Sequence, residues 1–249
     1  MSKIPLAVQL YSVRHDCEKD LLGSIAQVAK IGYEGVEFAG FFGHSAADIR
    51  KALDDNGLKC AGSHTGYHTL LPENFEKTVE FHLAIGCDNL IIPWIPEEKR
   101  NSVDSSKATA AELAELSEKL KPYKARTGFH VHDGDVKPLG ADGKGAYHII
   151  GENTPPEFVM QYDTANGAHG GADPVQPILD FPGRGITTHL KEYPFGKIIG
   201  QGDIPWAKVF DACEKVAGTQ WYIVEHEDEG IPPMDAIAQC LQSIRAMGR

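Results

Sequence analysis

The sequence has few cysteines, and their spacing serves neither metal binding nor a disulfide framework. The five cysteines are scattered along the chain, and no two of them stand in a C-x-x-C arrangement. Zinc–thiolate sites use closely spaced pairs, and disulfide frameworks use even sets, so the pattern argues against both. Free thiols in a reducing compartment are expected.

Three further absences narrow the class of protein. No apolar run approaches the roughly 20 residues of a membrane span. Lys and Arg number 24 against 35 Asp and Glu, a net charge of −11 that argues against binding to nucleic acid backbones. The N-terminus shows no basic segment followed by an apolar one, so no signal peptide is predicted and a cytoplasmic location is expected.

Short β-rich runs alternate with helix-period segments from one end of the chain to the other. This pattern predicts parallel βα units, and about 250 residues is typical of a (β/α)₈ TIM barrel. A single barrel domain covering residues 1–249 is predicted. The alternative, an open doubly wound sheet, is disfavoured because no G-x-G-x-x-G follows the first strand. The expected strands are Leu6–Val13, Gly35–Ala39, Lys59–His64, Asn89–Pro93, Gly128–Asp133, Phe158–Thr164, Ile186–Lys191 and Trp221–His226.

Four successive strands end on residues that ligate metals. His132, Asp163, His189 and Glu225 are separated by 31, 26 and 36 residues, and each interval fits one strand-plus-helix unit. The carboxyl ends of parallel strands converge on one mouth of a barrel, where such enzymes keep their active sites. Oxygen and imidazole ligands suit a divalent cation. The pattern therefore predicts a metal-dependent barrel enzyme.

The fifth strand offers several candidates for the remaining ligand or for an acid–base group. His130 and His132 share a parity, so both are expected to point toward the mouth, and Asp135 follows closely. The alternative for one buried histidine is a satisfied core imidazole. Lys191 shares a face with His189 and is a candidate partner for developing negative charge, or simply an exposed lysine at a strand end.

The early strands carry weaker signals. Glu37 and His64 are polar residues at strand ends, suited either to substrate hydroxyls and acid–base work or to plain polarity of the mouth. Trp94 follows the fourth strand, where an aromatic ring stacks on a sugar or belongs to the core. Asn166, just after Asp163, caps a following helix or contacts substrate, and we assign it to the substrate.

Several motifs together resemble the xylose-isomerase-like barrel family. They are Leu10–Arg14, Gly32–Glu37, Phe129–Asp133, Asp163–Asn166, His189–Lys191, Gly200–Trp206 and Val224–His226. This family, usually labelled sugar phosphate isomerase/epimerase, includes keto-sugar 3-epimerases, inosose dehydratases and keto-glycoside lyases or hydratases. The resemblance implies a TIM barrel with one divalent ion (Mn²⁺, Co²⁺, Mg²⁺ or Zn²⁺) on an acid of the fifth strand, Asp163, His189 and Glu225.

The sequence departs from the epimerases of that family on the fifth strand. Those members resemble each other in having a glutamate there, paired with the glutamate of the eighth strand as two bases. Here His130 or His132 takes that place, and the metal ligands are predicted to be His132, Asp135, Asp163, His189 and Glu225. His130, His132, Glu225, Lys191 and His64 are the predicted catalytic residues.

The predicted function is that of a metal-dependent isomerase or epimerase of a keto-sugar, sugar phosphate or cyclitol, acting through a metal-stabilised enediolate. The alternative is a dehydratase, lyase or hydratase that shares the same first step. Two alternatives from other classes are a repair endonuclease, which the acidic balance disfavours, and a barrel that only binds sugar. The expected partner is a small carbohydrate, without nucleic acid or membrane, and the homo-oligomeric state stays open.

Overall fold

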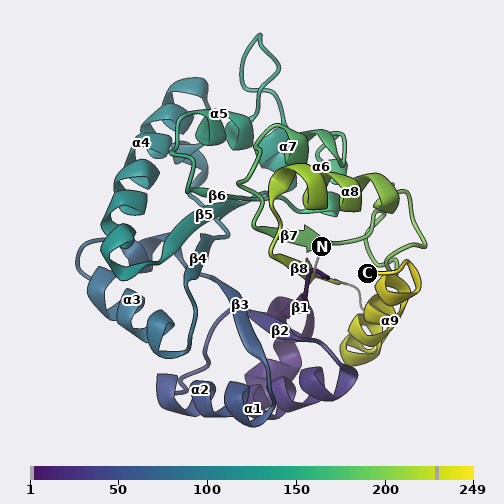
Figure 1. The fold of residues 1–249 in the computed structure, drawn as a ribbon. Coiled ribbons are helices and arrows are strands. Elements are labelled where there is room, and N and C mark those ends of the chain that lie inside the picture. The colour runs from purple at the N-terminus through teal and green to yellow at the C-terminus, as the bar shows by residue number, and fades with distance from the viewer. Residues whose placement is uncertain (1–2, 228–229) are drawn as a thin grey trace.

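Eight parallel strands form a barrel that is ringed by helices, as the alternating pattern predicts (Figure 1). The computed structural model describes residues 3–227 and 230–249. Within that part of the chain the strands are β1 (Leu6–Gln9), β2 (Gly35–Phe38), β3 (Lys59–His64), β4 (Asn89–Ile92), β5 (Arg126–His130), β6 (Val159–Gln161), β7 (Thr187–Leu190) and β8 (Trp221–Val224).

The strands pair in chain order, with β1 between β2 and β8, so the sheet runs continuously from β6 through β1 to β7. The two edges meet at a single parallel bridge between Asp163 and His189. Backbone hydrogen bonds from Met160 N to Arg184 O and from His189 N to Tyr162 O, both 2.9 Å, hold the same seam. Two of the predicted metal ligands thus lie where the barrel closes.

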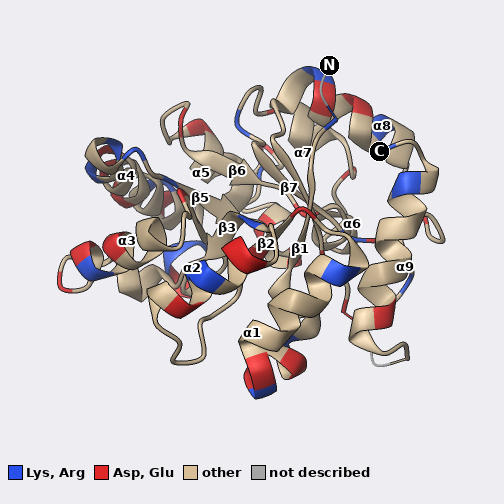
Figure 2. Ribbon diagram, turned by 60° about the horizontal axis from the view of Figure 1, so that its bottom comes forward, with Lys and Arg blue, Asp and Glu red and all other residues tan. Residues whose placement is uncertain are grey.

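The helices pack around the barrel and bury its outward-facing side chains in one large core. They are α1 (Arg14–Ile31), α2 (Ala46–Asp55), α3 (Phe75–Ala84), α4 (Val103–Leu120), α5 (Ala146–Glu152), α6 (Thr164–His169), α7 (Gln176–Leu179), α8 (Trp206–Ala212) and α9 (Pro233–Ala246). Lys and Arg lie interspersed with Asp and Glu on the outer helices, for example α1, α2 and α3 (Figure 2). None of the helices in the described part has the length and hydropathy that crossing a bilayer requires.

The interior of the barrel changes from apolar to polar along each strand. Inward-facing residues alternate, so Ala7 precedes Gln9, Val159 precedes Gln161, and Ile223 precedes Glu225. The first member of each pair is apolar and fully or almost fully buried, and the second carries hydrogen-bonding groups to the mouth. This arrangement places the candidate site directly above an apolar, buried layer of the barrel interior.

Seven of the eight strands in the described part of the chain end earlier than the sequence predicts, and β3 ends at His64 as predicted. β1 stops at Gln9 because its side chain accepts a hydrogen bond from Tyr11 N at 3.1 Å, which starts a 3₁₀ turn over Leu10–Val13. β6 stops at Gln161, and the predicted strand end at Thr164 is wrong because Asp163 caps α6 there. A helix over Thr164–His169 was not predicted, because it contains Asn166 and Gly167, both poor helix formers.

Candidate metal centre at the mouth of the barrel

Four side chains from four consecutive strands come together at the mouth. One ligand atom each from His130, Asp163, His189 and Glu225 lies within 4.8 Å of those of the other three. His130 ends β5, Asp163 follows β6, His189 belongs to β7 and Glu225 follows β8. All four are buried, with at most 6% of their surface exposed. Strand geometry alone therefore converts residues far apart in the sequence into one compact group.

The two carboxylate oxygens of Asp163 have different surroundings: one caps a helix, and the other faces the four-residue group. Oδ1 accepts hydrogen bonds from Ala165 N at 2.9 Å and Asn166 N at 2.7 Å, which caps α6. Oδ2 is buried and has no hydrogen-bond partner among the described residues, and it lies 3.8 Å from His189 Nδ1. Burial raises the pKa of Asp163 to about 6. A buried, unpaired carboxylate oxygen is rare in folded proteins, and a cation would satisfy it.

His189 lies between two carboxylates. Its Nδ1 is 2.9 Å from Glu225 Oε2, and its Nε2 is 2.6 Å from Glu37 Oε2. Although burial opposes the charge on the ring, Glu37 and Glu225 raise the pKa of His189 to about 10. Nδ1 therefore faces Asp163 and Glu225, which belong to the four-residue group, and Nε2 faces Glu37, which lies outside it.

Gln161 hydrogen-bonds to two of the imidazole rings, those of His64 and His130. Its Oε1 accepts from His130 Nδ1 at 2.9 Å and from His64 Nε2 at 3.0 Å, while its Nε2 donates to Glu37 and Thr187. With Nδ1 donating, the lone pair of the neutral ring is on Nε2 of His130, which lies 3.5 Å from Asn166 Nδ2. Burial holds the pKa of His130 well below its usual range, which keeps the ring neutral. Gln161 is not among the site residues predicted from the sequence, although it shares the inward parity of Asp163.

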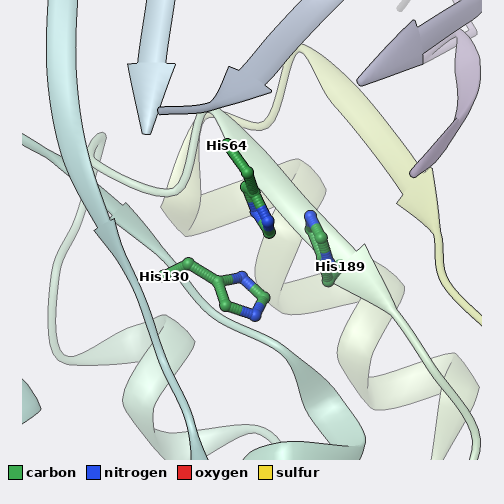
Figure 3. A group of neighbouring side chains, drawn as sticks. All are labelled: His64, His130 and His189. Atoms are coloured by element: carbon green, nitrogen blue, oxygen red, sulfur yellow. The ribbon is translucent and has the colours of Figure 1, made fainter. Parts of the chain in front are cut away.

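The rings of His64, His130 and His189 point toward one another from three strands (Figure 3). These three also form a cluster with mutually close ligand atoms. His64 stacks parallel to His189, with ring centroids 5.2 Å apart. Its Nε2 already contacts Gln161 and lies 3.2 Å from Glu37 Oε2, so His64 belongs to the wall of the group.

Lys191 holds the outer side of Glu225. Its Nζ lies 2.9 Å from Glu225 Oε1 and 2.5 Å from Glu227 Oε1, and the side chain is buried. Although burial opposes its charge, the carboxylates of Glu225 and Asp163 raise the pKa of Lys191. Lysine in turn holds the pKa of Glu225 well below its usual range, against the effect of burial. Both groups stay charged, with Lys191 contacting Glu225.

Other predicted ligands lie beside the four-residue group. Asp135 is buried against Arg100, with Oδ1 2.5 Å from Arg100 Nη1, and its Oδ2 accepts from His132 N at 2.8 Å. The ring of His132 packs edge-on against His130, with centroids 5.0 Å apart. Neither residue joins the group that brings ligand atoms together, and their predicted role as ligands stays a prediction.

The predicted substrate-binding residues differ in how accessible they are. Trp94 is 57% exposed and lines a cavity of about 440 Å³ over the group, together with Tyr11, His64, His132, Glu225 and Glu227. Glu37 is fully buried and bonded to its neighbours, so it faces His189 and not this cavity. Asn166 donates from Nδ2 to Val131 O at 3.1 Å and is also buried.

Comparison with known proteins gives one family match. A model of the xylose isomerase-like TIM barrel matches residues 25–247. An inosose dehydratase from Geobacillus kaustophilus (strain HTA426) is 23% identical over 190 residues, which cover 68% of this chain and 60% of that protein. The chain thus spans about 60% of the length of this curated relative.

Solved structures share the fold. A sugar phosphate isomerase/epimerase from Parabacteroides distasonis ATCC 8503 superposes with a TM-score of 0.85 at 20% identity, covering 99% of this chain and 97% of that one. The IOLI protein with a bound zinc atom gives a TM-score of 0.74 at 15% identity and covers 97% of both chains. At these identities the likeness establishes the barrel and leaves the chemistry to the residues.

Proposed function

Because the chain belongs to the xylose isomerase-like TIM barrel family, we propose that it is a divalent-metal-dependent isomerase or epimerase of a keto-sugar, sugar phosphate or keto-cyclitol. Its first step would be removal of the proton next to the substrate carbonyl. The observation that supports this best is Asp163 Oδ2, a buried and unpaired oxygen beside His189 among the described residues.

His130, Asp163, His189 and Glu225 would hold the ion. This set is favoured over the three-histidine cluster because it contains the unpaired oxygen and two carboxylates, which offset a divalent charge. His130 is favoured as the ligand from β5 because His132 and Asp135 do not join the group of close ligand atoms. Asp135 is also engaged by Arg100. When bound, a divalent ion supplies a Lewis acid that stabilises negative charge on substrate oxygens.

The surrounding residues fix the ligands before any ion binds. His189 would use Nδ1, which faces Asp163 and Glu225, because Nε2 donates to Glu37. A carboxylate on the far nitrogen of a ligating histidine sets its tautomer and ring orientation. Lys191 holds Glu225 Oε1 and leaves Oε2 directed at His189.

His132 and His64 are the proposed acid–base pair. Both line the cavity over the group, and neither belongs to the proposed ligand set. A neutral imidazole at His132 would take the proton, and His64, from β3, would deliver one to the intermediate as an imidazolium that has taken its proton from solvent; His132 would then release its proton to solvent. Delivery to the opposite face of the carbon gives an epimer, whereas delivery to a neighbouring hydroxyl expels water. Trp94 and Tyr11, both exposed in this cavity, would pack on the sugar ring.

A dehydratase or lyase is the second candidate, and it too has a specific observation in its favour. The end of β5 carries His130 and His132 in place of a glutamate, so the chain lacks the paired glutamates expected of an epimerase. The curated relative is named an inosose dehydratase. Both candidates begin with the same proton removal.

A substrate panel in D₂O tests the shared step. Ketoses, inososes and 3-keto-glycosides are incubated with the Mn²⁺-loaded protein, and NMR follows each α-hydrogen. We expect any true substrate to exchange or release this hydrogen, and EDTA to stop the reaction. An epimer as product supports the isomerase, and loss of water supports the dehydratase. Turnover with the α C–H bond intact contradicts the proposal.

A further inference from the structure

A second cavity opens beside the one over the candidate ligands. It measures about 520 Å³ and lies between the turn after β2, the loop after β3 and the first turns of α3. His64 lines both cavities, so the second space adjoins the one over His130 and Glu225 at this side chain. The side chains that shape it are Phe41, Thr65, His68, Asn74, Lys77 and Phe81.

The wall of the second cavity combines aromatic faces with available polar groups. Phe41 and Phe81 are half-buried neighbours whose ring centroids lie 4.6 Å apart. The threonine hydroxyls are already used, since Thr69 Oγ1 donates to Gly66 O and Thr78 Oγ1 to Thr69 O.

Three polar side chains of this wall are uncommitted. Within residues 3–227 and 230–249, His68, Asn74 and Lys77 form no side-chain hydrogen bond or ion pair. Aromatic faces with a few free donors are the surroundings that suit a ring bearing hydroxyl groups.

The turn after β2 adopts a costly backbone to place its aromatic residues. Phe42 has φ +49, in the left-handed region that bulky residues avoid, and it stands between Gly40 at φ +124 and Gly43 at φ +80. Phe42 is also 45% exposed. Backbone strain of this kind concentrates at ligand-binding segments, which fits a turn that shapes the cavity.

We propose that the second cavity binds the second ring of a two-ring substrate, a glycoside or disaccharide whose reacting ring lies over the candidate ligands. This inference rests on the proposed function. A cavity of about 440 Å³ already accommodates one sugar ring, so a monosaccharide leaves the adjoining 520 Å³ unused. Among the described residues that line it, Lys77 is the only Lys or Arg, and the aromatic content favours a neutral ring over a phosphate group.

Binding of two matched glucosides by isothermal titration calorimetry tests the proposal. Methyl β-D-glucopyranoside presents one ring, and phenyl β-D-glucopyranoside presents the same sugar with a second ring. We expect the phenyl compound to bind the wild-type protein about tenfold more tightly, because aromatic stacking adds to burial. Lys77→Trp, an exposed position whose new side chain fills the cavity, should reduce this ratio to about one.

Glu76→Trp is the matched control, because Glu76 is the exposed neighbour of Lys77 on α3 and does not line the cavity. It should keep the wild-type ratio. Equal affinity of the two glucosides for the wild-type protein, or an unchanged ratio in Lys77→Trp, contradicts the second-ring site alone. Failure of methyl glucoside to bind any of the three proteins contradicts the sugar site itself.

Discussion

Glu37 supports the candidate ligands from a fully buried position. It accepts hydrogen bonds from Gln9 Nε2 and Gln161 Nε2, both at 2.8 Å, and it contacts His189 Nε2 at 2.6 Å. Although burial opposes ionisation, His64 and His189 keep the pKa of Glu37 below its usual value. With these contacts Glu37 is proposed to orient His189, and its predicted substrate-binding role stays a prediction.

Glu37→Gln is expected to weaken binding of Mn²⁺ by between about 10- and 100-fold, the usual effect of losing a carboxylate behind a ligating histidine. Titration of the metal-free protein with Mn²⁺ measures the change. Glu34→Gln makes the same substitution at an exposed position of the same segment and should bind Mn²⁺ like wild type. Unchanged affinity in a folded Glu37→Gln protein would show that Glu37 does not position His189.

For single residues, the sequence predicted which side chains gather at the candidate site better than it predicted the role of each one. Asp163, His189 and Glu225 were identified from strand ends alone, and the structure brings them together. The member of the group that comes from β5 was harder to predict, because His130 and His132 have the same parity along the strand. What separates them is a set of contacts between distant strands: His130 Nδ1 bonds to Gln161 Oε1 and His130 joins the four-residue group, whereas His132 does not.

Among the elements, β5 depends on a glycine whose role the sequence did not reveal. Gly128 was predicted to begin the strand, but β5 starts at Arg126 and Gly128 lies within it, while Lys124 at φ +56 takes the left-handed position after the preceding helix. A Cβ at Gly128 would lie 2.4 Å from Val159 O and 2.5 Å from Val159 Cβ. Glycine here lets β5 and β6 approach closely beneath His130 and Gln161.

Gly128→Ala is therefore expected to lower the free energy of unfolding by about 1–3 kcal/mol, as overpacking of a close-packed interior does. Urea denaturation followed by circular dichroism measures the loss. Gly134→Ala is the control, because a Cβ there meets only Arg100 Nη1 at 3.7 Å, and it should change stability by less than about 0.5 kcal/mol. A Gly128→Ala protein as stable as wild type would argue against close packing at this point.

Most strand positions were predictable because the buried run is β-branched or apolar, as in β4 and β8, and β3 agrees residue for residue with the prediction. Strand ends were not, because they depend on caps such as Gln9 on Tyr11 N and Asp163 on Asn166 N. A polar residue at the end of a strand is read equally well as the next strand position or as a cap. Only the tertiary structure decides between them.

For the whole molecule, the closed barrel explains why residues so far apart in sequence form one group. Gln9, Glu37, His64, His189 and Glu225 reach the same space from β1, β2, β3, β7 and β8. Closure at the bridge of Asp163 and His189 sets their mutual distance. The fold class followed from the alternating pattern, whereas the second cavity beside His64 arises from loops whose shape no local pattern predicts.

Metal content of two variants tests the central claim, that His130 joins Asp163, His189 and Glu225 around one ion. Wild type, His130→Gln and His132→Gln are purified with Mn²⁺, dialysed and analysed by inductively coupled plasma mass spectrometry, with circular dichroism as the check on folding. We predict about one ion per chain in wild type and in His132→Gln, and a loss of nearly all metal in His130→Gln. Full metal retention in a folded His130→Gln protein would contradict the account.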